Sequence, residues 1–176
     1  GFGLFEVAVT AAATRAGAPA AAGLILALAS VGSAAGALVY GSRSWPLAAT
    51  GQYKAALAAM ASGLALLAPV TDLVLFGILA IVAGLPMSVV LAAQSVLIAD
   101  MAPRAALAEA FTWASTSLLA GVSAGIALGG LLLEVAPVGL TLLAAAAATA
   151  AGLAAACLMV HPARVDGRRD AREPGV

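Results

Sequence analysis

The sequence predicts an all-α fold, a polytopic membrane bundle of about six transmembrane helices. Hydrophobic residues make up 64% of the chain and charged residues only 9%, whereas an average soluble domain has about 25% charged residues. So few polar residues cannot cover the surface of a soluble domain, and lipid as the solvent removes that need. The few charges also divide the chain into long uncharged stretches.

Five of these stretches are long enough to cross a bilayer, which takes about 20 apolar residues within a range of roughly 17–25. A sixth, residues 1–14, is apolar apart from Glu6 but too short to span, and we interpret it as the second part of a helix whose first part is missing. Proline and glycine fall between the stretches, where helices are expected to end. The five long stretches are residues 16–42, 55–71, 73–99, 110–133 and 135–160.

Residues 1–162 are therefore predicted to form one six-helix transmembrane bundle with a truncated first helix. Residues 163–176 are charged and poor in apolar side chains, so we expect a disordered tail. Seven of the eight Lys and Arg residues fall in this tail and in the loops after the second and fourth helices, and only Arg15 falls on the other side. The positive-inside rule then places the tail in the cytoplasm.

The sequence offers little for catalysis or for metal binding. His161 and Cys157 are the only histidine and the only cysteine, and no single stretch contains a pair of carboxylates. Metal sites and acid–base pairs are built from such clusters. We therefore expect neither an enzyme nor a cofactor, and no nucleic-acid partner. The partner that the composition predicts is the lipid bilayer.

Glu6 is the only charged residue inside an apolar stretch. A charged group in hydrocarbon is costly, so such a residue usually faces a cavity and serves a substrate or a proton path. If its helix began about ten residues earlier, Glu6 would lie near the middle of the membrane. The alternative is that Glu6 lies near the interface and extends its carboxylate toward water.

Glycines recur at helical spacing in two of the stretches. In residues 110–133 they form one side of the expected helix, and a shorter pair occurs in residues 16–42. Glycine at positions i and i+4 lets a neighbouring helix approach closely in lipid. We therefore expect these glycines to be packing surfaces: Gly32, Gly36, Gly121, Gly125 and Gly129.

Polar side chains form a second pattern. Thr112, Thr116 and Ser123 fall within about 40° of one another on a helix, opposite the glycines. This stripe could line a polar path, or its hydroxyls could bond back to the carbonyl four residues earlier. Gln94 lies in another apolar stretch, where it could contact a substrate or join two helices by a hydrogen bond.

Three segments resemble the major facilitator superfamily of transporters. Residues 36–43 (Gly-Ala-Leu-Val-Tyr-Gly-Ser-Arg) are similar to the family's cytoplasmic-loop signature, with Tyr40 where the usual Asp would stand. Residues 121–130 resemble the antiporter signature Gly-Pro-x-x-Gly-Gly, with Ile126 where proline would stand. Residues 3–9 (Gly-Leu-Phe-Glu-Val-Ala-Val) are similar to a group of actinobacterial exporter-like members.

The resemblance implies the C-terminal six-helix half of such a transporter, whose partner would be a missing N-terminal half. It implies secondary active transport, with proton-coupled export of small molecules by rocking of the two halves around a site at the membrane midplane. Small-molecule substrate and protons would be further partners. The frequent Ala and the excess of Arg over Lys are common in GC-rich bacteria, so we expect a multi-pass protein of the bacterial cell (inner) membrane.

Two alternatives remain open. A six-helix scaffold or assembly partner that does not transport would face lipid all round, whereas half of a transporter would expose a continuous polar-lined face toward its missing partner. A small self-contained channel would need rings of repeated polar residues, for which the sequence shows no candidate.

Overall fold

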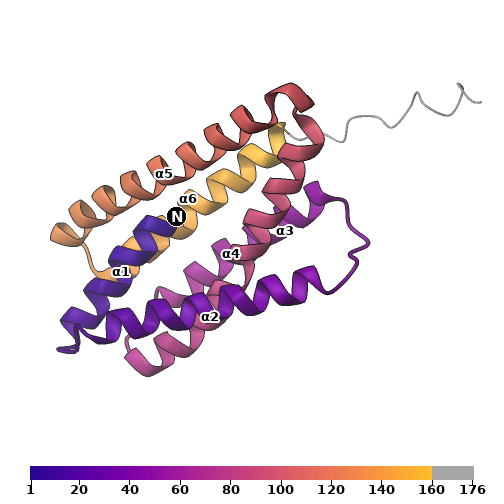
Figure 1. The fold of residues 1–176 in the computed structure, drawn as a ribbon. Helices are drawn as coiled ribbons and strands as arrows, with labels where there is room; N and C mark the ends of the chain where they lie inside the picture. The colour runs from indigo at the N-terminus through magenta and orange to yellow at the C-terminus, as the bar shows by residue number, and fades with distance from the viewer. Residues whose placement is uncertain (160–176) are drawn as a thin grey trace, which may run out of the picture.

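The computed structural model describes residues 1–159, and within them the predicted all-α fold is confirmed (Figure 1). The predicted tail, residues 163–176, and His161 lie outside the described residues. The elements are α1 (Phe2–Arg15), α2 (Ala21–Gly41), α3 (Ala49–Leu67), α4 (Leu73–Met101), the short 3-10 helix η1 (Arg104–Ala106), α5 (Leu107–Val135) and α6 (Val138–Met159).

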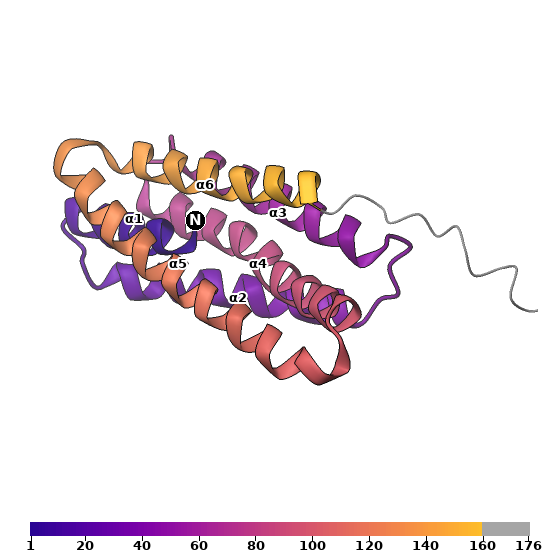
Figure 2. The ribbon, with the colours of Figure 1, turned by 90° about the horizontal axis from the view of Figure 1, so that it is seen from above.

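The helices lie in three layers of two, which Figure 2 shows from above: α3 and α6, then α1 and α4, then α2 and α5. The closest packing joins α2 to α4, α3 to α4, α3 to α6 and α1 to α5. Further packing joins α1 to α6, α1 to α2, α4 to α5 and α5 to α6. The middle layer therefore contacts both outer layers, and it positions the site described below.

Most helix limits agree with the uncharged stretches, and two differ for physical reasons. α2 begins only at Ala21, because Gly17 adopts a φ of 73° in the turn that follows α1. That left-handed conformation is accessible to glycine at little cost. α3 begins at Ala49, six residues before its uncharged stretch, because the helix continues through Gln52 and Lys54. Polar residues at a membrane helix end can extend toward water without breaking the helix.

Among the described residues, four helices are long and apolar enough to cross a membrane: α2, α4, α5 with η1, and α6. α1, which the sequence already predicted to be too short, and α3, which was expected to span, do not meet that description. α1 has only 14 residues, and the first turns of α3 are polar. Large apolar side chains are nevertheless exposed along α2, α4, α5 and α6. Such a continuous apolar exterior suits lipid, because large exposed apolar patches are rare on soluble monomers.

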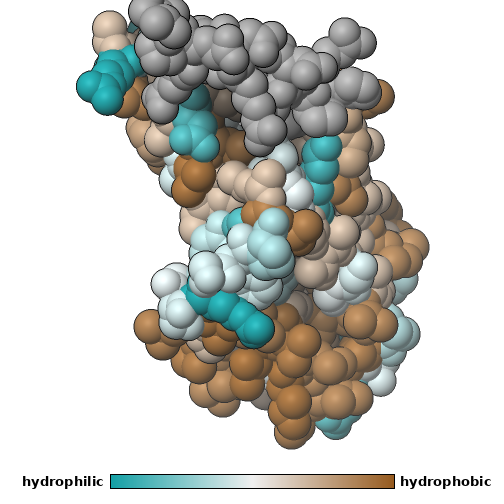
Figure 3. All heavy atoms as spheres, turned by 90° about the vertical axis from the view of Figure 1, so that its right-hand side faces the viewer, coloured by the Kyte–Doolittle hydropathy of each residue, from teal (hydrophilic) through white to brown (hydrophobic). Residues whose placement is uncertain are grey.

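The two ends of the bundle differ. The Arg15 end contains three loops, residues 15–20, 68–72 and 136–137. Two of these loops pack together, because Gly139 at the start of α6 lies against the Ala68 carbonyl. The Arg43 end carries the α2–α3 loop and η1. Figure 3 looks at the Arg43 end and shows separate groups of hydrophilic atoms there, with hydrophobic atoms covering the flanks. This pattern suits a bundle whose ends meet water and whose sides meet lipid.

Candidate functional site

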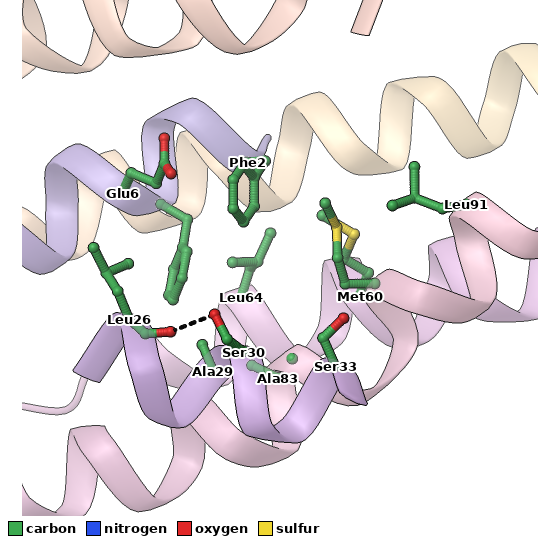
Figure 4. Close-up of a pocket in the computed structure, with 13 residues that line it drawn as sticks. Phe2, Glu6, Leu26, Ala29, Ser30, Ser33, Met60, Leu64, Ala83 and Leu91 are labelled. Carbon is green, nitrogen blue, oxygen red and sulfur yellow. Dashed lines mark hydrogen bonds between the residues drawn. The ribbon is translucent and has the colours of Figure 1, made fainter. Parts of the chain in front are cut away.

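A cavity of about 280 Å³ lies among the first four helices, and we call it the Glu6 cavity. In Figure 4, Phe2 and Glu6 of α1 lie across it from Leu26 and Ser30 of α2, with side chains of α3 and α4 completing the wall. It is lined by Phe2, Phe5, Glu6, Leu26, Ala29, Ser30, Ser33, Met60, Leu64, Ala83, Gly84, Met87 and Leu91.

The depth of this cavity follows from helix geometry. Glu6 precedes Arg15, which lies at one end of the bundle, by nine residues of continuous helix, or about 14 Å at 1.5 Å per residue. The hydrocarbon core of a bilayer is about 30 Å thick. Ser30 and Met87 also lie midway along their own helices. Glu6 and the cavity are therefore near mid-depth of the bundle. A carboxylate that serves a substrate or proton path is expected at that depth.

The lining combines one carboxylate with soft and aromatic apolar groups. The rings of Phe2 and Phe5 have centroids 6.4 Å apart and are tilted by 37°. Met60 and Met87 contribute polarisable thioethers. The Ser30 hydroxyl donates a hydrogen bond to the Leu26 carbonyl at 2.9 Å. Glu6 itself is half-buried.

A second hollow of about 520 Å³, more open than the first, runs between α1 and α5, and we call it the α1–α5 groove. Glu6 lines both hollows. Thr10 donates its hydroxyl to the Glu6 carbonyl at 3.0 Å, and Thr14 donates to the Thr10 carbonyl at 2.8 Å. Both threonines also line the groove, so polar groups lead from Glu6 at mid-depth to the Arg15 end.

Arg15 closes the outer end of this groove. Its guanidinium donates to the carbonyls of Leu133 at 3.1 Å and of Ala136 at 3.5 Å. These are carbonyls at the C-terminal end of α5, which have no partner within the helix. A cation there also interacts favourably with the helix dipole.

The glycines of α2 pack against α4 at backbone distance. The hydrogen that replaces a Cβ on Gly32 points at the Ile81 carbonyl oxygen, and that on Gly36 points at the Leu85 carbonyl oxygen. In return, Gly84 of α4 points at the Ala29 carbonyl of α2. A Cβ at any of these positions would meet backbone oxygen closer than real Cβ atoms come. The crossing therefore depends on glycine and on weak Cα–H···O contacts.

The contact between α1 and α5 has the same construction. Gly3 of α1 points at the Val122 carbonyl of α5. A Cβ on Gly125 would lie 3.2 Å from the Leu4 nitrogen, and one on Gly129 would lie 3.4 Å from Leu4 Cδ2 and Val7 Cβ. Gly121 differs from the expectation: a Cβ there would meet no heavy atom within 4 Å. Gly3, near the start of α1, already lies against the Val122 carbonyl, and Gly121 packs against no neighbour.

The other residues singled out by sequence do not join the Glu6 cavity. Gln94 is half-buried on α4 and lines neither hollow. Thr112, Thr116 and Ser123 are exposed on α5 and line neither hollow. Thr112 donates to the Ala108 carbonyl at 2.8 Å, which is the back-bonding alternative considered for this stripe.

Several lining residues were not anticipated. Thr10 and Thr14 could have been found, because they follow Glu6 at intervals of four and so share its helix face. Ser30, Ser33 and Met60 could not have been found in this way. The sequence of α2 or α3 alone does not show that these residues lie near a carboxylate of α1.

The segment similar to the cytoplasmic-loop signature is braced by its aromatic residues. The Tyr40 hydroxyl donates a hydrogen bond to Gln52 Oε1 of α3, and Trp45 Nε1 donates to the Tyr40 carbonyl at 3.1 Å. The Arg43 guanidinium lies 6.0 Å from the Trp45 ring centroid. Tyr40 therefore joins the two ends of the α2–α3 loop.

No family model, curated protein or solved structure matches this chain. Within residues 1–159, the fold and site define an all-helical bundle with four helices that could cross a membrane and a carboxylate-lined cavity at mid-depth.

Proposed function

We propose that this chain is the C-terminal six-helix half of a secondary transporter of the major facilitator type, which exports small molecules in exchange for protons across a bacterial inner membrane. Glu6 is the proton-coupling residue, and the Glu6 cavity is this half's share of the substrate site. In the parent protein, α1 continues upstream into a full span and α3 completes the set of six.

The observation that carries the proposal is an internal repeat of packing. Suppose that α1 is exchanged with α4, α2 with α5 and α3 with α6. The α2–α4 contact then becomes the α5–α1 contact, and the α3–α4 contact becomes the α6–α1 contact, and all four are observed. The α3–α6 contact converts into itself, and α1–α2 into α4–α5. The α5–α6 contact is the exception, because the described residues show no comparable α2–α3 contact. Major facilitator halves are built from such three-helix repeats, related by inverted topology.

The glycines follow the same exchange. Gly32 and Gly36 of α2 pack on α4, as Gly125 and Gly129 of α5 pack on α1. Gly84 of α4 approaches α2 as Gly3 of α1 approaches α5. The approach at Gly125 and Gly129 is looser than that at Gly32 and Gly36. A repeat of the contacts alone could arise from any six antiparallel helices. Its repetition in the type and position of the residue at each crossing favours an internal duplication.

The exposed surface favours a transporter half over a scaffold. The first half of α5 is exposed and carries the hydroxyls of Thr112, Thr116 and Ser123. The α1–α5 groove adds Thr10 and Thr14 on the neighbouring helix. Exposed large apolar side chains lie on the same half of α5, namely Phe111, Trp113, Leu118 and Leu119. We propose that this side of the bundle faces the N-terminal half, with the hydroxyls along a water-filled path.

The test uses the native protein in everted membrane vesicles from cells that express its gene. A panel of small substrates is added to energised vesicles, and release of protons from the interior is followed with a pH-sensitive dye. At least one substrate should release protons, and the native protein should contain about twice as many spans as this chain. A native protein of six spans, with no substrate-induced proton release, would support the scaffold instead.

A further inference from the structure

We infer that the Glu6 cavity binds small organic monocations that carry an apolar body, such as a quaternary ammonium group attached to one aromatic ring. Glu6 is the counter-ion, and Phe2 and Phe5 supply ring faces for the cationic head. The apolar body lies against Met60 and Met87. Transport of such a ligand rests on the proposed function, whereas its binding does not.

Charge is the first step of the argument. Glu6 is the only charged residue among those that line the cavity, and α2, α3 and α4 contribute none to the lining. In the adjoining groove, the other charged residue is Arg15, about 14 Å along the helix and hydrogen-bonded to the end of α5. The half-buried N-terminal amino group of Gly1 precedes Phe2 on α1 but does not line the cavity. No basic side chain of the lining therefore offsets the cost of a carboxylate at mid-depth. A monocationic ligand offsets that cost, whereas an anion would add to it.

The apolar lining selects among cations. Quaternary ammonium groups cannot donate hydrogen bonds, and proteins recognise them by aromatic faces within about 6 Å. Phe2 and Phe5 follow each other on one face of α1 beside Glu6 and turn toward the cavity. Thioethers are polarisable and adapt to ligands of different shape. A hydrated metal ion would find few oxygen ligands here, since Ser30 and Ser33 are the other polar side chains of the lining.

Volume limits the size of the ligand. The cavity of about 280 Å³ lies just below the range of roughly 300–1,000 Å³ that drug-sized ligands occupy. At about 30 Å³ per water-sized group, it holds on the order of ten non-hydrogen atoms. Benzyltrimethylammonium matches this size, charge and shape.

The experiment measures binding of benzyltrimethylammonium to the native protein in lipid nanodiscs by titration calorimetry. Neopentylbenzene, the neutral isostere, and phenylmethanesulfonate, an anion of similar size, are the comparison ligands. The cation should bind saturably at one site, at least tenfold more tightly than either comparison ligand. Equal binding of the neutral isostere would overturn the inference, because lipid partitioning alone would then explain it.

Variants assign the binding to the cavity. Glu6→Gln should weaken cation binding at least tenfold, while Glu109→Gln, which changes an exposed carboxylate on α5, should leave it unchanged. Ser30→Phe fills the cavity and keeps the carboxylate, so it should also abolish binding, and Ser62→Phe on an exposed face of α3 is its control. Circular dichroism and melting temperature check folding, and unaltered binding by folded Glu6→Gln and Ser30→Phe would refute the site.

The outcome separates this inference from the proposed function. Binding that depends on Glu6, without substrate-induced proton release by the native protein, would leave the site standing and remove the transporter. Proton-linked transport of other molecules, without cation binding in the Glu6 cavity, would support the transporter and refute the cation site.

Discussion

The guanidinium of Arg15 donates a hydrogen bond to the backbone carbonyl of Leu133 at 3.1 Å, joining the end of α1 to the end of α5 across 118 residues of sequence. A second hydrogen bond reaches the Ala136 carbonyl at 3.5 Å. Further along, Gly125 and Gly129 of α5 let α1 approach closely. The Arg15 end of α5 is thus held by a polar contact and its middle by close backbone approach.

Arg15→Met should loosen the end of α5. Methionine keeps an apolar stem of similar length but cannot donate to the two carbonyls. Amide hydrogen exchange in the last turn of α5 should become about two- to fivefold faster, which corresponds to roughly 0.3–1 kcal/mol for a cation at a helix C-terminus. Mass spectrometry of exchanged peptides measures this, with Arg43→Met as the control at the other end. Unchanged exchange would show that the contact does not hold α5.

Gly32→Ala should destabilise the bundle, and Gly121→Ala should not. A Cβ on Gly32 would overlap the Ile81 carbonyl oxygen, so α2 and α4 must separate, at a cost of about 1–3 kcal/mol. Gly121 has open space, and alanine there improves helix stability by roughly 0.5–1 kcal/mol. Thermal unfolding in detergent compares the two variants. Equal melting temperatures would mean that the α2–α4 crossing relaxes at no cost.

Glu6→Gln should abolish uphill export by the native protein while expression and membrane insertion persist. Glutamine keeps the size and hydrogen bonding of the side chain but cannot exchange a proton. Counterflow, which needs no net proton movement, should survive better than proton-driven export. Transport of radiolabelled substrate in reconstituted vesicles measures both. If Glu6→Gln and Glu6→Ala both export uphill at the normal rate, the coupling residue lies elsewhere in the parent.

The two ends of the bundle should lie on opposite sides of the membrane. Seven of the eight basic residues belong to one side, so a reporter fused after Val176 should report cytoplasm. A reporter inserted at Pro137, at the Arg15 end, should report the outside. Alkaline phosphatase and green fluorescent protein fusions distinguish the two locations. Reversed signals at both positions would invert the orientation.

The helices could be predicted from sequence because residues next to each helix end mark its limit. Charges, Pro69 and Pro137 interrupt the apolar stretches, and α4 and α6 begin close to where those interruptions end. The start of α3 could not be predicted in the same way, because a helix that leaves the membrane can continue through Gln52 and Lys54 without any break in its hydrogen bonding.

The site was predictable only in part. Glu6 could be identified because a charge among apolar residues is costly wherever the helix packs. Gly32 and Gly125 could be identified as packing positions by their spacing, but not their partners Ile81 and Leu4, which lie on helices brought near by the fold. Gly121 has the same spacing as Gly125 and no neighbour, since helical periodicity shows which side a residue faces and not how far the next helix extends.

The mid-depth position of Glu6 has an electrical consequence for the proposed exchange of protons. Moving one elementary charge across a whole membrane changes its free energy by about 2.3 kcal/mol per 100 mV. A proton that reaches Glu6 from one end of the bundle crosses about half of that field, so the voltage does roughly 1 kcal/mol of work per 100 mV on binding. The voltage does a similar amount of work when the proton leaves Glu6 for the far side. Proton binding and proton release would therefore both respond to the membrane potential.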